Sequence, residues 1–284
     1  MHVLVAGCGW LGGAVAARLL ARGDRVTGVR SDPARAEALR AQGIEPLVLD
    51  LADPDAADRI PAGIEAVLAL QSAAEGGPSA YRRAYVLANA NLLRAAGRFG
   101  WRALVYSAST GVFGQRDGSD VVETSQPQPG PGSPTVLAEA EQRLLEAAAA
   151  GLPARILRLS GLYGPGRTWM IDRVRSGAMG LGPGDGCWMN ACHRDDAVTA
   201  LLAVLDRGRD GGIYHATDAE PMRRREVIRH VAARLGIPAP AAAEAFLGPD
   251  RRILGTATRA ELGFGLRWPS LRAGLEPFLD PAAG

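Results

Sequence analysis

A run of six residues near the start, Gly7-Cys8-Gly9-Trp10-Leu11-Gly12, constrains the fold more than any other part of this sequence. It follows the apolar run Val3–Ala6, which is typical of a buried strand, and it precedes Ala14–Arg22, whose apolar residues share one helical face. A glycine pattern of this form between a strand and a helix indicates a turn that binds the phosphates of a dinucleotide. The sequence therefore predicts a phosphate-binding strand–turn–helix unit.

Each glycine of this turn has its own physical role. Gly7 allows the tight turn, Gly9 lets the backbone approach a pyrophosphate, and Gly12 lets the helix pack close to the strand. The free N–H groups at the start of the helix would then face the phosphates. Trp10 and Leu11 belong to the same turn, and we expect them to contact the dinucleotide as well.

Segments typical of strands and of helices alternate through the first 160 residues. The strands are apolar on both faces, as in a parallel sheet that helices cover on two sides. This alternation predicts an α/β fold with a doubly wound parallel sheet of the Rossmann type. The expected strands are Val3–Ala6, Arg25–Val29, Glu45–Leu49, Ala66–Leu70, Ala103–Ser107 and Ala154–Leu159, and the expected helices are Ala14–Ala21, Pro33–Gln42, Tyr81–Phe99 and Val136–Ala149.

The regular alternation breaks after Gly161, and Arg167–Asn190 is rich in glycine and irregular. We therefore expect a nucleotide-binding domain over residues 1–164 and a smaller C-terminal substrate lobe over most of 165–284. Residues 191–217 are expected to return to the first domain. In this part the pattern predicts helices over Met170–Arg175, Asp196–Arg207 and Arg225–Leu235, and a strand over Ile213–Ala216.

The composition excludes several classes of partner. The net charge of +2 gives no broad basic surface for a nucleic acid. No apolar run approaches the roughly 20 residues that cross a bilayer, so we expect no membrane span. Three cysteines make no disulfide framework, and the first residues lack the basic segment of a signal peptide, so a cytoplasmic protein is expected. Cys187, Cys192 and His193 are too few ligands for zinc, and we expect no metal.

The end of the second predicted strand bears on the choice between the two nicotinamide dinucleotides. An acid there binds the ribose 2′-hydroxyl of NAD, whereas an arginine accommodates the 2′-phosphate of NADP. Arg30 and Ser31 occupy this place, and Arg35 follows on the next helix. A guanidinium can hold a phosphate through two parallel hydrogen bonds, which favours NADP as the cofactor. NAD stays open as the alternative, with Asp32 on the ribose and Arg30 as a surface residue.

Several later segments resemble those of one enzyme family. Ser107–Gly114 is similar to its SSxxxYG segment and Leu157–Arg167 to its LRxxxxYGPGR segment. His193–Val198 and Glu261–Phe264 are similar to its HvdDva and eLGf segments. In this order, over nearly the full chain, they resemble an extended short-chain dehydrogenase/reductase (SDR) of the NAD-dependent epimerase/dehydratase family. The GxGWLG opening points to its atypical, YeeZ-like branch.

The resemblance implies further cofactor contacts and a first catalytic residue. Asp50 follows the third strand, where an acid of the family often binds the adenine amino group. Leu70, at the end of the fourth strand, is assigned to the cofactor site as well. Ser109 matches the serine that hydrogen-bonds the reacting oxygen in the family, and Thr110 is its neighbour.

The usual tyrosine and lysine pair of the family is missing. The lysine normally lowers the tyrosine pKa by its charge, and all 32 basic residues here are arginine. With Glu141 aligned to the acid that follows the pair, Ser133 takes the tyrosine position and Leu137 the lysine position. A shift of two residues would place Pro131 and Thr135 there instead. The usual helix asparagine is also missing, and Tyr85 lies near its place.

Three interpretations of this departure stay open. In the first, Ser109 or Thr110 binds the substrate oxygen while Tyr163 or Tyr85 supplies the proton. In the second, a preactivated substrate such as an iminium needs little acid help, because the cofactor carries the difficult chemistry. In the third, the protein binds NADP without turnover, as a redox sensor or regulatory protein. Arg167 could stabilise negative charge in the first case.

We predict an NADP-dependent oxidoreductase or epimerase with an atypical active site that lacks the Tyr-Lys pair. Its substrate would be a small carbonyl, imine or sugar-nucleotide-like molecule, bound at the carboxyl ends of the parallel strands. The expected substrate contacts are Ser133, Arg167, Trp169 and Trp188. His193 is expected to be structural, and the resemblance is compatible with a homodimer through the two long helices.

Overall fold

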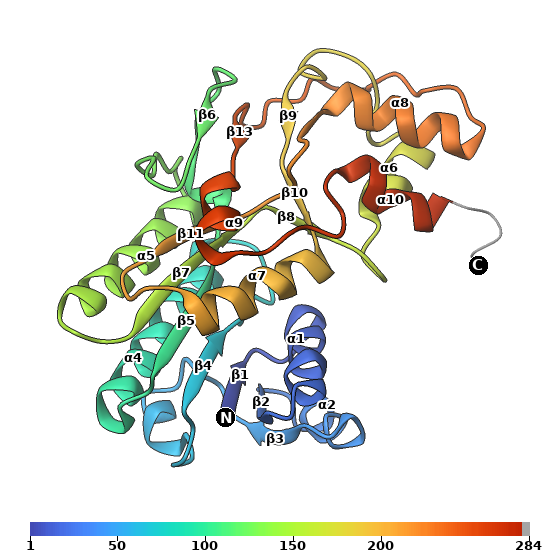
Figure 1. The fold of residues 1–284 in the computed structure, drawn as a ribbon. Coiled ribbons are helices and arrows are strands. Elements are labelled where there is room, and N and C mark those ends of the chain that lie inside the picture. The colour runs from blue at the N-terminus through green and yellow to red at the C-terminus, as the bar shows by residue number, and fades with distance from the viewer. Residues whose placement is uncertain (280–284) are drawn as a thin grey trace. The chain divides into compact units, whose positions relative to one another are not determined.

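The computed structural model describes residues 1–279, which form two compact units (Figure 1). Unit 1 contains Met1–Val112, Pro129–Arg158 and Val198–Tyr214; among the described residues, unit 2 contains Phe113–Gln128, Leu159–Ala197 and residues 215–279. The expected division at residue 164, with a return of residues 191–217 to the first domain, did not include the passage of Phe113–Gln128 into unit 2. One reason for this passage is that β6 (Asp120–Val121) pairs in parallel with β13 (Arg252–Ile253), which joins Phe113–Gln128 to unit 2.

A seven-stranded sheet organises the first part of the chain, and it confirms the predicted doubly wound fold. The strand order is β11-β7-β5-β4-β1-β2-β3, and the ladders that join β3, β2, β1, β4 and β5 are all parallel. The order reverses beside β1, where ligands bind in sheets of this kind. The strands are β1 (His2–Ala6), β2 (Arg25–Arg30), β3 (Glu45–Val48), β4 (Ala66–Ala69), β5 (Ala103–Ser109), β7 (Ala154–Leu159) and β11 (Ile213–Ala216).

The central strands are buried on both faces. Val3–Ala6 of β1 and all of β4 have no exposed surface, which explains why their sequences are continuously apolar. Helices α4 and α5 pack on one another, and their apolar side chains join those of β4 and β5 in one core. The helices of this part are α1 (Trp10–Ala21), α2 (Pro33–Glu37), α3 (Pro78–Tyr81), α4 (Ala88–Phe99), α5 (Ser133–Ala149) and α7 (Arg194–Arg207); η1 (Arg40–Gln42), η2 (Ala56–Arg59) and η4 (Thr110–Val112) are single turns.

Two predicted helices differ from those observed. The helix expected over Tyr81–Phe99 consists of α3, a π-helical stretch η3 (Arg82–Leu87), and α4. A π turn arises from a tertiary rearrangement of the backbone hydrogen bonds, and helical periodicity does not reveal it. The helix expected over Pro33–Gln42 ends at Glu37, and η1 follows as a separate 3₁₀ turn.

Unit 2 is built from short two-stranded pairs and helices around its own core. Strands β8 (Gly161–Tyr163) and β10 (Ala191–His193) pair in parallel, and β9 (Trp188–Met189) pairs antiparallel with β12 (Met222–Arg223). Apolar side chains of α6 (Trp169–Arg175), α8 (Arg224–Leu235) and α10 (Leu271–Leu279) fill the core, and α9 (Thr256–Leu262) follows β13. No helix within residues 1–279 is long and apolar enough to cross a membrane.

A buried ion pair links α5 to β7 in unit 1. Arg158 Nη2 lies 2.8 Å from Glu141 Oε2, and Arg158 Nε donates to the same carboxylate. The two side chains are 1% and 2% exposed. A buried carboxylate is costly without its cation, so each partner depends strongly on the other.

Replacing Arg158 by leucine is therefore expected to lower the free energy of unfolding by about 3–5 kcal/mol, because Glu141 then stays buried without its guanidinium. Thermal unfolding followed by circular dichroism measures the loss. The double variant Arg158→Leu, Glu141→Leu removes both charges and is expected to recover most of it. An unchanged Tm in the single variant would contradict this account of the pair.

Candidate active site

The glycine turn at the end of β1 is shaped by close backbone contacts. Gly7 has a φ of +90°, and a Cβ atom there would clash with the backbone nitrogen of Gln71. A Cβ atom at Gly12 would lie 2.5 Å from the carbonyl oxygen of Gly7. A side chain at Gly12 would push α1 away from the turn. The roles predicted for these two glycines are thus visible in the geometry.

Arg30 lies against the same turn from the end of β2. A Cβ atom at Gly9, the residue that precedes α1, would lie 2.9 Å from Nη1 of Arg30. The first turn of α1 contains no acidic side chain that would repel a phosphate. The guanidinium of Arg30 and the N-terminus of α1 therefore meet at this turn, next to Gly7, whose positive φ favours glycine. This arrangement fits the phosphates of a dinucleotide.

Cys8 fills the space beneath this turn. Its thiol is buried against Gly28, and its backbone N–H donates to the carbonyl of Val29. Burial raises the pKa of the Cys8 thiol to about 11, although the charge of Arg30 acts in the opposite direction. Cys8 is therefore a neutral packing residue at physiological pH.

The residues after Arg30 form the start of α2. The Asp32 carboxylate accepts a hydrogen bond of 2.8 Å from the backbone N–H of Arg35 and so caps this helix. Ser31 and Arg35 are exposed beside it. The carboxylate that could have bound a ribose is thus engaged in helix capping, whereas the guanidinium of Arg30 reaches the turn.

Asp50 and Leu70 follow β3 and β4. One Asp50 oxygen accepts from the backbone N–H of Ala52, and the other lies 2.7 Å from Nη2 of Arg83. Leu70 is buried, and its N–H donates to the carbonyl of Ala6. Leu70 thus joins β4 to β1 at the strand ends. The roles predicted for both residues in cofactor binding stay predictions.

The end of β5 carries the predicted serine. The Ser109 hydroxyl oxygen accepts a hydrogen bond of 3.0 Å from the backbone N–H of Gly111, which leaves its proton to donate. The neighbouring Ser107 hydroxyl donates to the carbonyl of Ala69 and so ties β5 to β4. Thr110 is buried. Ser109 is therefore the partly exposed hydroxyl donor of this strand end.

Helix α5 brings an apolar residue close to this serine loop. Leu137 is 7% exposed, and its Cδ1 lies 3.6 Å from the position of a Cβ atom at Gly111. Ser133, in the position expected for the tyrosine, is the first residue of α5. On the alignment that uses Glu141, aliphatic carbon thus takes the place of the ammonium group of the family, and the shift that would put Thr135 there stays open.

Tyr163 belongs to the core of unit 2. Its side chain has no exposed surface, its hydroxyl donates to the carbonyl of Ser270, and its ring contacts His193 edge to face. Burial raises the pKa of Tyr163 far above its ordinary value. Burial also lowers the pKa of His193 to about 4, so this imidazole is neutral at pH 7. Both side chains have the surroundings of structural residues. Tyr163 is therefore not suited to donate a proton to a substrate.

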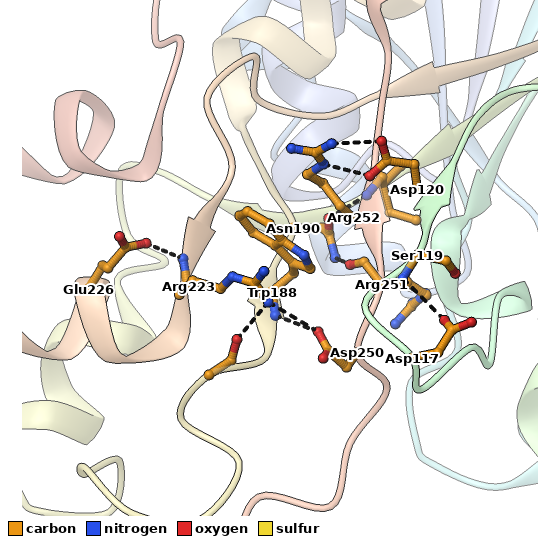
Figure 2. A network of polar contacts seen from close by, with 12 residues as sticks. Asp117, Ser119, Asp120, Trp188, Asn190, Arg223, Glu226, Asp250, Arg251 and Arg252 are labelled. Carbon is orange, nitrogen blue, oxygen red and sulfur yellow. Dashed lines mark hydrogen bonds and ion pairs between the residues drawn. The ribbon is translucent and has the colours of Figure 1, made fainter.

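Trp188 takes part in a network of polar and stacking contacts in unit 2 (Figure 2). The guanidinium carbon of Arg223 lies 3.6 Å from its ring centroid, and that of Arg252 lies 5.2 Å from it. The backbone N–H of Trp188 donates to the carboxylate of Asp250. Arg252 pairs with Asp120 through two contacts of 2.6 Å. These contacts join the segments around β9, β12 and β13.

The other residues predicted for substrate binding are also in unit 2. Arg167 is exposed, and its backbone exchanges two hydrogen bonds with Gly164. Trp169, at the start of α6, is 41% exposed. Unit 1 thus holds the predicted cofactor residues together with Ser109, Thr110 and Ser133, whereas Tyr163, Arg167, Trp169 and Trp188 lie in unit 2. Within residues 1–279, no three histidine, cysteine or acidic side chains cluster as metal ligands would.

Sequence reasoning missed an amide pair beside the glycine turn. Gln71, whose backbone touches Gly7, donates from Nε2 to Oδ1 of Asn89 on α4 over 2.7 Å. The remaining polar atoms of these amides, Gln71 Oε1 and Asn89 Nδ2, are buried and have no hydrogen-bond partner among residues 1–279. In the sequence, Tyr81, Tyr85 and Asn89 are spaced four residues apart, which would place them on one face of a regular helix. This spacing was the available signal for Asn89.

Comparison with known proteins agrees with the doubly wound fold and with the glycine turn of a dinucleotide-binding family. Residues 3–216 match the sequence profile of the NAD dependent epimerase/dehydratase family. Protein YeeZ of Escherichia coli K12 is 29% identical over 273 residues, which cover 94% of this chain and 96% of YeeZ. A 2-alkyl-3-oxoalkanoate reductase of Stenotrophomonas maltophilia is 29% identical over 296 residues, which cover 98% of this chain and 86% of the reductase. The solved structure of MoeE5 in complex with UDP-glucose and NAD has a TM-score of 0.81 and 26% identity over 98% of this chain and 97% of MoeE5.

Substitution of Gly12 by alanine is expected to weaken dinucleotide binding at least tenfold and to lower Tm, because the new methyl group meets the Gly7 carbonyl. Gly13 is the matched control, since a Cβ atom there meets nothing within 4 Å. Gly13→Ala should leave binding unchanged and add roughly 0.5–1 kcal/mol of stability through helix propensity. Titration with NADPH and thermal unfolding measure both effects, and equal behaviour of the two variants would refute the packing argument.

Proposed function

Because the chain belongs to the NAD-dependent epimerase/dehydratase family, we propose that it is an NADP-dependent oxidoreductase acting on a small carbonyl or imine compound. The observation that carries this proposal is the guanidinium of Arg30 against Gly9 at the phosphate-binding turn. The reductase activity named for the Stenotrophomonas relative supports a carbonyl substrate. Membership in the family supports a nicotinamide dinucleotide as the cofactor.

The proposed cofactor site lies within unit 1. The pyrophosphate would lie over Gly9 at the N-terminus of α1, where backbone N–H groups and the helix dipole favour an anion. Arg30, with Ser31 and Arg35 beside it, would hold the 2′-phosphate that distinguishes NADP from NAD. The cofactor, when bound, supplies the hydride for reduction.

The substrate oxygen would be held at the end of β5. Ser109 can donate its hydroxyl proton there, because its oxygen is already oriented by the N–H of Gly111. A hydrogen bond aimed at an oxygen that gains negative charge stabilises the transition state more than the ground state. Ser109 therefore orients the carbonyl and accelerates hydride addition to its carbon.

One observation favours a second candidate function, an NADP-binding regulatory protein without turnover. Leu137 places an apolar side chain next to the serine loop, in the position expected for the lysine. Tight binding of NADPH with no oxidation of it by any ketone, imine or iminium compound would support this second function and contradict the first.

Arg30→Ser tests the choice of cofactor. Loss of a charged hydrogen-bond partner is worth about 1.5–3 kcal/mol, so NADPH affinity should fall roughly tenfold to a hundredfold while NADH affinity stays the same. Arg40→Ser is the control, because Arg40 is an exposed arginine paired with Glu37 and its removal changes the net charge equally. Fluorescence titration of wild type and both variants with NADPH and NADH measures the six dissociation constants. A wild-type protein that prefers NADH would remove the argument from Arg30.

Ser109→Ala tests the substrate site. Removal of one donor to a developing oxyanion should lower kcat on the order of a hundredfold, with NADPH affinity unchanged. Ser107→Ala serves as the comparison, since the Ser107 hydroxyl is directed into the sheet at Ala69. Its kcat should stay within about twofold of wild type, because only a structural hydrogen bond of about 1 kcal/mol is lost. Steady-state kinetics that show equal losses in both variants would contradict the role of Ser109.

A further inference from the structure

Reduction of a carbonyl needs a proton at the oxygen, and helix α5 offers no obvious source of it. Ser133 and Leu137 occupy the positions expected for the tyrosine and the lysine, and Leu137 is buried. A positioned general acid contributes about 10²–10⁴ to the rate of such a step. A general acid for this step would have to be a side chain of unit 1 that holds a proton near Ser109.

The helical segment that leads into α4 contains an irregular turn with a tyrosine in it. Tyr85 lies in the π-helical stretch Arg82–Leu87. Such stretches are rare and occur frequently at functional sites, because the extra residue in the turn redirects a side chain. The Tyr85 hydroxyl lies 3.4 Å from the backbone nitrogen of Ala73, which donates to it. Ala73 belongs to the segment that follows β4.

A chain of contacts connects this segment to the predicted cofactor turn and to β5. The backbone of Gln71, two residues before Ala73, touches Gly7, and its side chain bonds to Asn89, one helical turn after Tyr85. The Ser107 hydroxyl joins β5 to the carbonyl of Ala69 at the end of β4. The Tyr85 phenol and the Ser109 strand end therefore lie at the same edge of the sheet, where β4 and β5 finish.

The surroundings of the phenol keep it protonated. Burial raises the pKa of Tyr85 above its ordinary value of 10, and two other phenols face its ring, Tyr81 from α3 and Tyr106 from β5. Because the phenol oxygen already accepts from Ala73, its own proton remains available to donate. Tyr85 is thus protonated at neutral pH, so it holds a proton that it can donate and is unsuited to act as a base.

We propose that Tyr85 donates the proton to the substrate oxygen, in place of the tyrosine that helix α5 lacks. This assignment rests on the proposed reductase function. Reduction of the carbonyl consumes one hydride, taken from a C–H bond of the reduced nicotinamide, which is thereby oxidised, and one proton, taken from the O–H bond of Tyr85. A C–H bond forms at the carbonyl carbon and an O–H bond at its oxygen. The phenolate that remains takes a proton from water.

Tyr85→Phe and Tyr81→Phe form a matched pair of variants, because the two tyrosines pack against each other and against the same core. Two probes separate the proton from the hydride. Ethyl acetoacetate is a ketone and needs a proton at oxygen. An N-methylated dihydroisoquinolinium salt accepts hydride without any proton. Loss of NADPH absorbance measures kcat for each, and fluorescence titration and thermal unfolding report binding and stability.

Tyr85→Phe should lower kcat for ethyl acetoacetate at least a hundredfold while reduction of the iminium probe and NADPH affinity remain as in wild type. Tm should fall only by the small amount expected when the hydrogen bond from Ala73 is lost. Tyr81→Phe should match wild type in every assay. The wild-type kcat for the ketone should stay level as pH rises through 9, because the protonated phenol is the active form and its pKa is raised.

Three results would overturn the assignment. Equal ketone turnover in Tyr85→Phe and wild type would remove Tyr85 and leave the reductase function intact. Equal losses on both probes, or a fall in NADPH affinity, would assign Tyr85 a structural role. Turnover of neither probe by wild type, with NADPH bound, would overturn the proposed reductase function and this assignment with it.

Discussion

The close approach of the Gly7–Gly12 turn to its neighbouring backbones is the constraint on which the rest of unit 1 depends. Gly7 meets the backbone of Gln71 after β4, and Gly12 meets the carbonyl of Gly7 itself. These two contacts bring the ends of β1 and β4 together and hold α1 against them. The strand order reverses at the same place, so the free end of α1 lies where sheets of this kind bind their ligands.

The chemistry of this chain is further limited by its use of arginine as the only long basic side chain. An arginine stays charged at any accessible pH, so it can bind an anion or balance a buried carboxylate, but it transfers no proton. Arg158 neutralises Glu141 inside unit 1, Arg30 faces the phosphate turn, and Arg223 stacks on Trp188. In the proposed oxidoreductase reaction the proton therefore comes from a group other than a basic side chain of this kind, such as a phenol, a hydroxyl, a carboxyl, an imidazole or water. The phenol of Tyr85 is close to the strand ends, whereas the phenol of Tyr163 is enclosed in a core. Tyr85 is therefore the better placed of the two to supply that proton.

The sheet, the glycine turn and the family could be predicted from the order of amino acids alone. Apolar strands of the right length, glycines at fixed spacing and the segment around Leu157–Arg167 act locally or through repeated patterns, and such patterns are readable in one dimension. The remaining features follow from the tertiary structure. It engaged Asp32 as a helix cap, enclosed Tyr163, and paired Gln71 with Asn89. It also opened a π turn around Tyr85 within a helix of ordinary periodicity. These outcomes depend on which distant segments meet, because burial and hydrogen-bond partners are properties of the packed chain and leave little trace in local sequence.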